Sequence, residues 1–313
     1  MEGMFSFLHD LFGIRFVRQE MELWDEKASA YDIYDGDDLF ARVYFDLEAR
    51  KGKRGGAWMH NFQTHCEDPK GCRHLSSAFV VCNFPPSNET SPSLLRHDDV
   101  VTLFHEMGHT LHHLMSRVKE HGVSGVNGVE WDAVEFPSQF LENFAYEPQV
   151  LKMFARHHES GEVLSDAMIG KLIRAKNFQS ALFMLRQLEF ALFDFKLHLS
   201  LHQGEEVQTL LDSIRERTSL IKPPSYNRFQ NGFSHIFSGG YSAGYYSYKW
   251  AEVLSADAYY AIVDEGIFGS ELAHKYKEVV LAKGGSQSMQ ELFVEMMGRE
   301  CETKHLLRLS GIE

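Results

Sequence analysis

Cysteines and long apolar runs are both scarce in this sequence of 313 residues. The four cysteines form neither a C-x-x-C pair nor a ladder of regular spacings: Cys66, Cys72, Cys82 and Cys301. This pattern argues against a disulfide framework and against a cysteine-ligated metal. We interpret all four as free thiols in a reducing compartment.

No apolar run approaches the roughly 18 residues needed to cross a bilayer, so we expect no membrane partner. The opening stretch, MEGMFSFLHDLFGIRF, is interrupted by polar and charged side chains, lacks a basic start and shows no small-residue cleavage site. It predicts an amphipathic helix and not a secretory signal. Together with the free thiols, this favours a cytoplasmic protein.

Positive charge is in deficit, with 31 Lys and Arg against 44 Asp and Glu and a formal net charge of -13. Such a surface would release no counterions from phosphates, which excludes a nucleic-acid backbone as the expected partner. The chain is 44% hydrophobic and 24% charged, and its length suffices for one large or two modest domains with a real core. We therefore expect a soluble globular protein.

Residues 1–90 predict the opening helix followed by a small antiparallel sheet. Asp35-Gly36 separates two runs of β-branched and aromatic residues within 28–48, as in a hairpin, and the run at 76–86 predicts a strand that two prolines end. Residues 91–313 are helical almost throughout, with helical periodicity in six stretches: 98–117, 165–201, 205–220, 244–264, 270–283 and 287–300. The fold class is mainly α (α+β).

The segment HDDVVTLFHEMGHTLHHLMSR (97–117) combines a helical pattern with an H-E-x-x-H motif. At 100° per residue its apolar side chains form one stripe and its histidines lie on the opposite face. His105 and His109 are one turn apart, so both rings can reach one Zn²⁺. The motif by itself also occurs by chance, and the helix pattern makes a purely structural interpretation less favoured. We predict that three neighbouring histidines are not ligands: His112, His113 and His121.

A catalytic zinc site needs a third protein ligand and leaves the fourth position for water. Downstream, a glycine-rich connection can reverse the chain before WDAVEFPSQFLENFAYE, which carries Asp132, Glu135 and Glu142. We predict Glu135 as the third ligand of a single Zn²⁺. Asp132, three residues earlier, is predicted to accept the free N–H of a ligand histidine. Pro137 should kink or start a helical segment here.

Two long motifs resemble the thimet-oligopeptidase family of metallopeptidases, peptidase family M3. HEMGH at 105–109 with EWDAVEFPSQFLENF at 130–144 matches the signature of that family, and YNRFQNGFSHIFSGGYSAGYYSYKW at 226–250 is similar to its tyrosine-bearing substrate loop. The similarity is greatest to the bacterial oligopeptidase A branch and extends over essentially the whole chain. It implies a zincin-like catalytic domain over 1–313 that cleaves short peptides in the cytosol.

By residue match, the resemblance implies His105, His109 and Glu135 as ligands and Glu106 as the general base. Tyr241, Tyr248 and His235 match family positions that contact the substrate and the transition state. The glycines of GGYSAGYY would let Tyr241 or Tyr248 swing towards the reacting oxygen. Some tyrosines of this loop are instead expected to pack, Tyr246 above all and Tyr245 with it.

Family members are about twice as long, so this chain resembles their carboxyl-terminal catalytic half. The amino-terminal half, which forms the other wall of a deep channel, is absent, and self-association or a complementary half could replace it. The alternative to a zinc endopeptidase is a truncated, non-catalytic homologue that binds zinc or peptides, although the intact Glu106 argues against it. We also hypothesise that an extended peptide adds as a strand to an edge formed by AFVVCNF (78–84).

Overall fold

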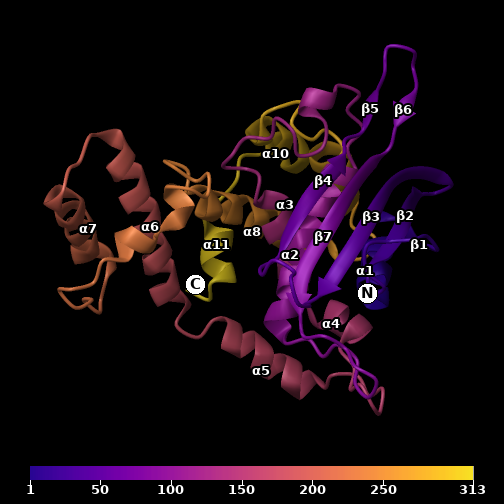
Figure 1. Ribbon diagram of the computed structural model, residues 1–313, viewed down its shortest axis with the longest axis horizontal. Coiled ribbons are helices and arrows are strands. Elements are labelled where there is room, and N and C mark those ends of the chain that lie inside the picture. Colours follow the sequence, from indigo (N-terminus) through magenta and orange to yellow (C-terminus); the bar gives the residue numbers. More distant parts are fainter. Residues whose placement is uncertain (313) are drawn as a thin grey trace.

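A small sheet with helices on one face makes up most of the molecule. The computed structural model describes residues 1–312. The five strands lie in the order β1 (Ile14–Gln19), β2 (Ser29–Asp35), β3 (Asp38–Glu48), β7 (Ser76–Phe84) and β4 (Trp58–Gln63), and β5 (Cys66–Glu67) pairs with β6 (Arg73–His74) in a separate ribbon (Figure 1). The sheet is near the amino terminus, as predicted.

The strand pairs are antiparallel except one. β7 runs parallel to β3, whereas β1–β2, β2–β3 and β4–β7 are antiparallel. The parallel pair arises because β7 inserts between β3 and β4 instead of pairing outside β4. The insertion also makes β7 an interior strand, so the hypothesis that AFVVCNF forms the edge is wrong, and the free edge on this side belongs to β4.

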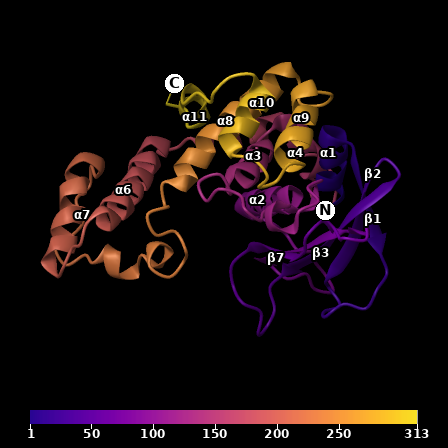
Figure 2. The same ribbon diagram turned by 90° about the horizontal axis from the view of Figure 1, so that it is seen from above.

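The helices of the main body cover one face of the sheet, as Figure 2 shows from above. They are α1 (Glu2–Phe12), α2 (His97–Leu114), α3 (Phe136–Phe144), α4 (Pro148–Phe154), α8 (Ser247–Glu265), α9 (Glu271–Tyr276), α10 (Met289–Met297) and α11 (Lys304–Leu309), with a π-helical turn at Lys277–Leu281. One hydrophobic core joins the sheet to these helices, and its fully buried aromatic rings include Phe7, Phe104, Phe140 and Phe293.

Three further helices form an arm that extends from the main body: α5 (Asp166–Lys176), which runs from the side of α4 (Figure 1), and α6 (Ser180–Leu199) and α7 (Glu205–Thr218), which lie at the end of the molecule away from the sheet (Figures 1 and 2). The sequence predicted a single helical stretch over 165–201, and the structure divides it. Gln179 has a φ of 58°, a left-handed conformation that ends one helix before the next begins at Ser180. Within residues 1–312, no helix has the length and apolar character required to cross a membrane.

Candidate metal centre

The close contact between α2 and α3 brings the predicted ligands together. Gly108 of α2 faces the start of α3, and a Cβ atom at this position would lie 2.3 Å from the carbonyl oxygen of Pro137. Only glycine permits so close an approach of two backbones. Pro137 lies in the first turn of α3, as its missing N–H allows, and Glu135 is the residue immediately before that helix. Glu135 is thereby held opposite the histidines of α2.

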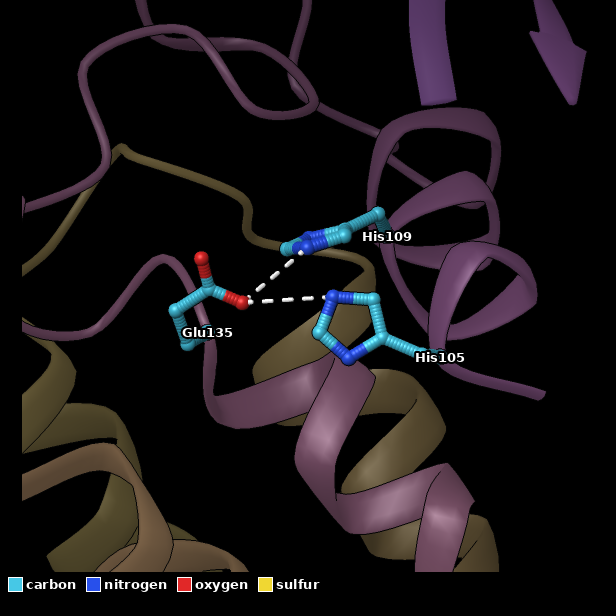
Figure 3. A group of neighbouring side chains, drawn as sticks. All are labelled: His105, His109 and Glu135. Carbon is cyan, nitrogen blue, oxygen red and sulfur yellow. Dashed lines mark ion pairs between the residues drawn. The ribbon is translucent and has the colours of Figure 1, made fainter. Parts of the chain in front are cut away.

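His105, His109 and Glu135 converge on one point (Figure 3). Oε2 of Glu135 lies 3.2 Å from Nε2 of His109 and 3.5 Å from Nε2 of His105. Glu135 is buried, while both histidines keep some exposure. Burial raises the pKa of Glu135, but the hydrogen bond and charge of His109 and the charge of His105 outweigh it and lower the pKa to about 2. The carboxylate is therefore ionised.

This donor set fits a zinc ion. Two imidazole nitrogens and one carboxylate oxygen are the ligands of many catalytic zinc sites. Ligand atoms about 2.0–2.1 Å from a tetrahedral Zn²⁺ lie about 3.4 Å from one another. The separations of 3.2 and 3.5 Å at Glu135 are close to this value. No other group of three such side chains with this convergence occurs in residues 1–312.

Glu106 follows His105 on α2 and is buried. Burial raises the pKa of its carboxyl, while the charges of His105 and His109 and the nearby backbone N–H of Met59 act in the opposite direction. Met59 belongs to β4, the edge strand. Glu106 thus lies between the predicted ligands and the free edge of the sheet.

The hydrogen-bond partner of His105 is Glu142 and not Asp132. Nδ1 of His105 donates to Oε1 of Glu142 at 2.6 Å, which orients Nε2 towards Glu135. Asp132 was predicted to accept the free N–H of a ligand histidine, and for His105 the structure corrects this. Asp132 lies in the turn before α3 and accepts a hydrogen bond from the hydroxyl of Tyr246 at 2.8 Å. The spacing of seven residues between Glu135 and Glu142, two helical turns, could have identified Glu142.

Glu142 raises the basicity of His105. Burial lowers the pKa of His105, but the hydrogen bond that His105 donates to Glu142 and the charges of the surrounding carboxylates outweigh it and raise the pKa to about 9. Ser138 is a hydrogen-bond partner of Glu135 that the sequence did not indicate. Its buried hydroxyl donates to Oε2 of Glu135 at 3.0 Å and fixes that carboxylate just before the start of α3.

The tyrosine-bearing loop reaches the same centre from the start of α8. The hydroxyl of Tyr241 donates to Oε1 of Glu135 at 2.8 Å, and Tyr248 stacks on Tyr241 with ring centroids 4.8 Å apart. His235 is exposed, and its ring centroid lies 6.2 Å from that of Tyr241. Burial raises the pKa of both phenols, that of Tyr248 to about 12. Both phenols are therefore hydrogen-bond donors at neutral pH.

Several side chains near the centre were predicted to pack or to remain outside the ligand set. Tyr245 packs in a small core, as expected, but Tyr246 is 38% exposed and uses its hydroxyl on Asp132. His112 is fully buried, which lowers its pKa to about 3, and His113 shares a hydrogen bond with the carbonyl oxygen of Gln63 at 2.8 Å. Neither joins the three converging residues, and the cysteines are free thiols.

The chain is similar to known proteins over nearly its whole length. Oligopeptidase A of Salmonella typhimurium is 42% identical over 315 aligned positions, which cover 99% of this chain and 46% of that protein. The organellar oligopeptidase A of Arabidopsis thaliana is 40% identical over 325 positions, which cover 100% of this chain and 41% of that protein. The chain thus spans about half the length of the curated relatives that it matches.

A solved structure described as a putative oligoendopeptidase F has a TM-score of 0.56 to this chain at 18% identity, covering 86% of this chain and 42% of that one. This likeness shows the fold. The profile of peptidase family M3 matches residues 1–312, which is nearly the whole sequence. Both the fold and the profile agree with the resemblance drawn from HEMGH and the tyrosine loop, and the chain belongs to peptidase family M3.

Proposed function

We propose that this chain is a zinc-dependent endopeptidase that hydrolyses short peptides, with residues 1–313 forming one zincin-like catalytic domain. The observation that carries the proposal is the convergence of His105, His109 and Glu135 beside the buried carboxyl of Glu106. Membership of a peptidase family supports it. The three converging residues would hold one Zn²⁺.

Each residue of the centre has a role in this proposal. The bound metal supplies a Lewis acid and an acidified water. Glu106 accepts a proton from the attacking water and returns it to the leaving amine. Tyr241 and Tyr248 donate hydrogen bonds to the oxyanion that develops on the scissile carbonyl, and Tyr241 then exchanges its bond to Glu135 for one to the substrate. His235, at the exposed rim, contacts the bound peptide.

The free edge of β4 offers a place for the peptide backbone. Among residues 1–312, β4 pairs with β7 alone, and the backbone N–H of its Met59 lies near Glu106. An extended peptide laid along this edge would pair backbone with backbone and bring a peptide bond to the general base. Such pairing tolerates many side chains, so broad specificity for short peptides follows.

We also propose that the arm packs against a complementary amino-terminal half. The relatives are about twice as long as this chain, and α6 exposes a row of large apolar side chains that residues 1–312 do not cover: Leu182, Phe183, Leu188, Leu192, Phe195 and Leu199. Exposed apolar area of this kind marks protein interfaces. We also propose a cytoplasmic location, which the free thiols of the four cysteines support.

The partner proposal can be tested with the amino-terminal half of Salmonella oligopeptidase A as the probe. We expect the two polypeptides to co-elute in size-exclusion chromatography, and Phe183→Ser with Leu199→Ser to separate them. A homodimer that the same substitutions dissociate would instead identify self-association as the use of this surface.

The enzymatic proposal can be tested with a quenched fluorescent peptide. We expect cleavage that a chelator abolishes and Zn²⁺ restores, and a fall in kcat of about 10²- to 10⁴-fold in Glu106→Gln with unchanged zinc content. Glu120→Gln, which changes an exposed carboxyl on the loop after α2, is the matched control and should cleave like the parent. If the zinc-loaded parent and Glu106→Gln behaved alike, the chain would be a non-catalytic zinc- or peptide-binding homologue.

A further inference from the structure

A pocket opens beside the metal centre, on the side of α3 that carries Glu142. Glu142, Tyr248 and His235 line it and also belong to the centre, so the pocket is continuous with the proposed reaction site. Its far wall is built from the junction of α5 and α6 together with the end of α11. A peptide that occupies the centre therefore has direct access to this pocket.

The charged groups of the pocket are paired, with one exception. Glu142 accepts the hydrogen bond of His105, and Lys249 forms an ion pair with Glu252. Lys176, the last residue of α5, has no such partner among residues 1–312. Its ammonium lies 4.3 Å from the ring centroid of Tyr146 and makes no hydrogen bond or ion pair with the described part of the chain.

Lys176 carries its positive charge in an environment that disfavours the charged form. Burial lowers its pKa to about 8, although the charges of Glu142, Glu252 and Glu147 act in the opposite direction. The ammonium is still mostly protonated at neutral pH. Placing a charge where water is largely excluded costs free energy unless a counter-charge meets it. A methionine of similar length would fill the same space without that cost.

An unpaired acceptor lies in the same pocket. The side-chain amide of Gln139 donates to the carbonyl oxygen of Tyr248 at 3.0 Å, and its own Oε1 is buried without a hydrogen-bond partner in residues 1–312. Within the described part of the chain, the pocket thus presents one free cation and one free carbonyl oxygen. The matching ligand carries a negative charge and an N–H group, as a peptide with a carboxylate does.

We propose that this pocket binds a carboxylate-bearing part of the substrate peptide, with Lys176 recognising the carboxylate and Oε1 of Gln139 accepting a hydrogen bond from a backbone N–H. The carboxylate is either the carboxyl terminus of the peptide or an Asp or Glu side chain. The inference rests on the proposed peptidase function, because it takes the peptide as the ligand. A neutral peptide would leave the Lys176 charge uncompensated, and a basic one would be repelled.

The test measures peptide binding and not turnover. Zinc-loaded protein with Glu106→Gln is titrated into a short fluorescent peptide prepared in four versions, with a free or an amidated carboxyl terminus and with Glu or Gln inside. We expect at least one carboxylate version to bind about tenfold or more tightly than the fully neutral one. Which version is preferred identifies the terminus or the side chain as the source.

Adding Lys176→Met should abolish the preference for a carboxylate. The carboxylate peptide should bind about tenfold more weakly, and the binding of the neutral peptide should not change. Lys176→Arg should keep it, and Lys171→Met, which removes an exposed lysine from the same helix, should leave it as in the parent. Lys176→Gln repeats the loss in case the methionine variant misfolds. Melting temperatures check folding, and Lys176→Met should melt no lower than the parent because the charge of a half-buried lysine without a partner among residues 1–312 is removed.

Two results would overturn the proposal. One is equal binding of all four peptides to the parent, and the other is a carboxylate preference that survives both Lys176→Met and Lys176→Gln. Neither result depends on cleavage. If carboxylate binding behaves as expected but the protein with Glu106 restored cleaves no peptide, the pocket stands and the peptidase proposal fails.

Discussion

The main body and the arm bury their side chains very differently. The body encloses a continuous core in which Phe104, Phe140 and Phe293 have almost no exposure. On α6, a helix of 20 residues, only Glu189, Phe193 and Asp194 are buried. The metal ligands all come from the body, so their geometry is stabilised by packing that this chain supplies itself.

The arm is nevertheless connected to the centre through one buried carboxylate. Asp194 of α6 accepts hydrogen bonds from the backbone N–H groups of Ala243 and Tyr245, at 2.9 and 2.8 Å. Ala243 has a φ of 57°, an unfavourable conformation for a residue with a Cβ atom. Asp194 therefore holds the loop that presents Tyr241. The body therefore positions the metal ligands, whereas the arm positions the phenols.

The largest contrast between the two regions should come from deleting an aromatic ring in each. Phe104→Ala should lower the free energy of unfolding by about 3–5 kcal/mol, because a fully buried ring leaves a cavity. Phe183→Ala in α6, where the ring is 62% exposed, should change it by no more than about 0.5 kcal/mol. Urea unfolding followed by circular dichroism measures both, and equal losses would refute the contrast.

A matched pair of glycine substitutions should give the next largest effect. Gly108→Ala should destabilise the body by about 3 kcal/mol and reduce zinc content, because the new Cβ would clash with the backbone at Pro137 and separate α3 from α2. Gly170→Ala in α5 should stabilise the arm by about 0.5–1 kcal/mol, because its Cβ would meet only a flexible arginine side chain. Thermal unfolding and metal analysis decide the outcome, and a Gly108→Ala protein with full zinc content would contradict it.

Replacing Asp194, which holds the tyrosine-bearing loop, should impair catalysis without impairing zinc binding. Asp194→Ala leaves two backbone N–H groups without their acceptor, which should cost about 1–3 kcal/mol and loosen the loop. We expect kcat on the fluorescent peptide to fall about tenfold or more while zinc affinity stays unchanged. Asp212→Ala, an exposed carboxyl on α7, is the control. A parallel loss of zinc would show that the arm also supports the ligands.

Lowering the pH should produce the smallest change in stability. This change should arise in the sheet of the main body. Burial raises the pKa of Asp46, but Arg50, Lys53 and Trp24 donate hydrogen bonds to it and lower the pKa from 3.8 to about 2. A carboxyl whose pKa is lower in the folded than in the unfolded protein stabilises the fold at pH values above its unfolded-state pKa. It loses that contribution as the pH falls towards its folded-state pKa. The stability of the parent should therefore decrease from about pH 4 towards pH 2.

The same titration of Asp46→Asn gives the control. This variant should be less stable near neutral pH and should lack the corresponding acid-dependent loss. Tryptophan fluorescence follows the change, because the indole N–H of Trp24 bonds directly to Asp46 at 2.8 Å. Superimposable pH profiles of parent and variant would show that other carboxyls govern the acid response.

Much of the fold and of the ligand set could be predicted from local patterns. The hairpin around Asp35-Gly36, the strand at 76–84 and the helix that carries His105 and His109 depend on periodicity and turn chemistry over short stretches. The placement of β7 inside the sheet could not be predicted in this way, because strand order depends on pairing between distant segments.

The metal centre likewise combines features that local sequence predicts with features that depend on contacts between distant segments. That two imidazoles share one face of α2 and that Glu135 can join them could be predicted from local sequence, because helix geometry relates residues four apart and a glycine-rich connection reverses the chain. Three contacts follow from tertiary packing alone: Glu142 and not Asp132 bonds to His105, Tyr241 contacts Glu135, and Lys176 has no ion-pair partner among residues 1–312 beside the centre. These contacts join helices and loops far apart in the chain, and their geometry follows from how the whole core packs.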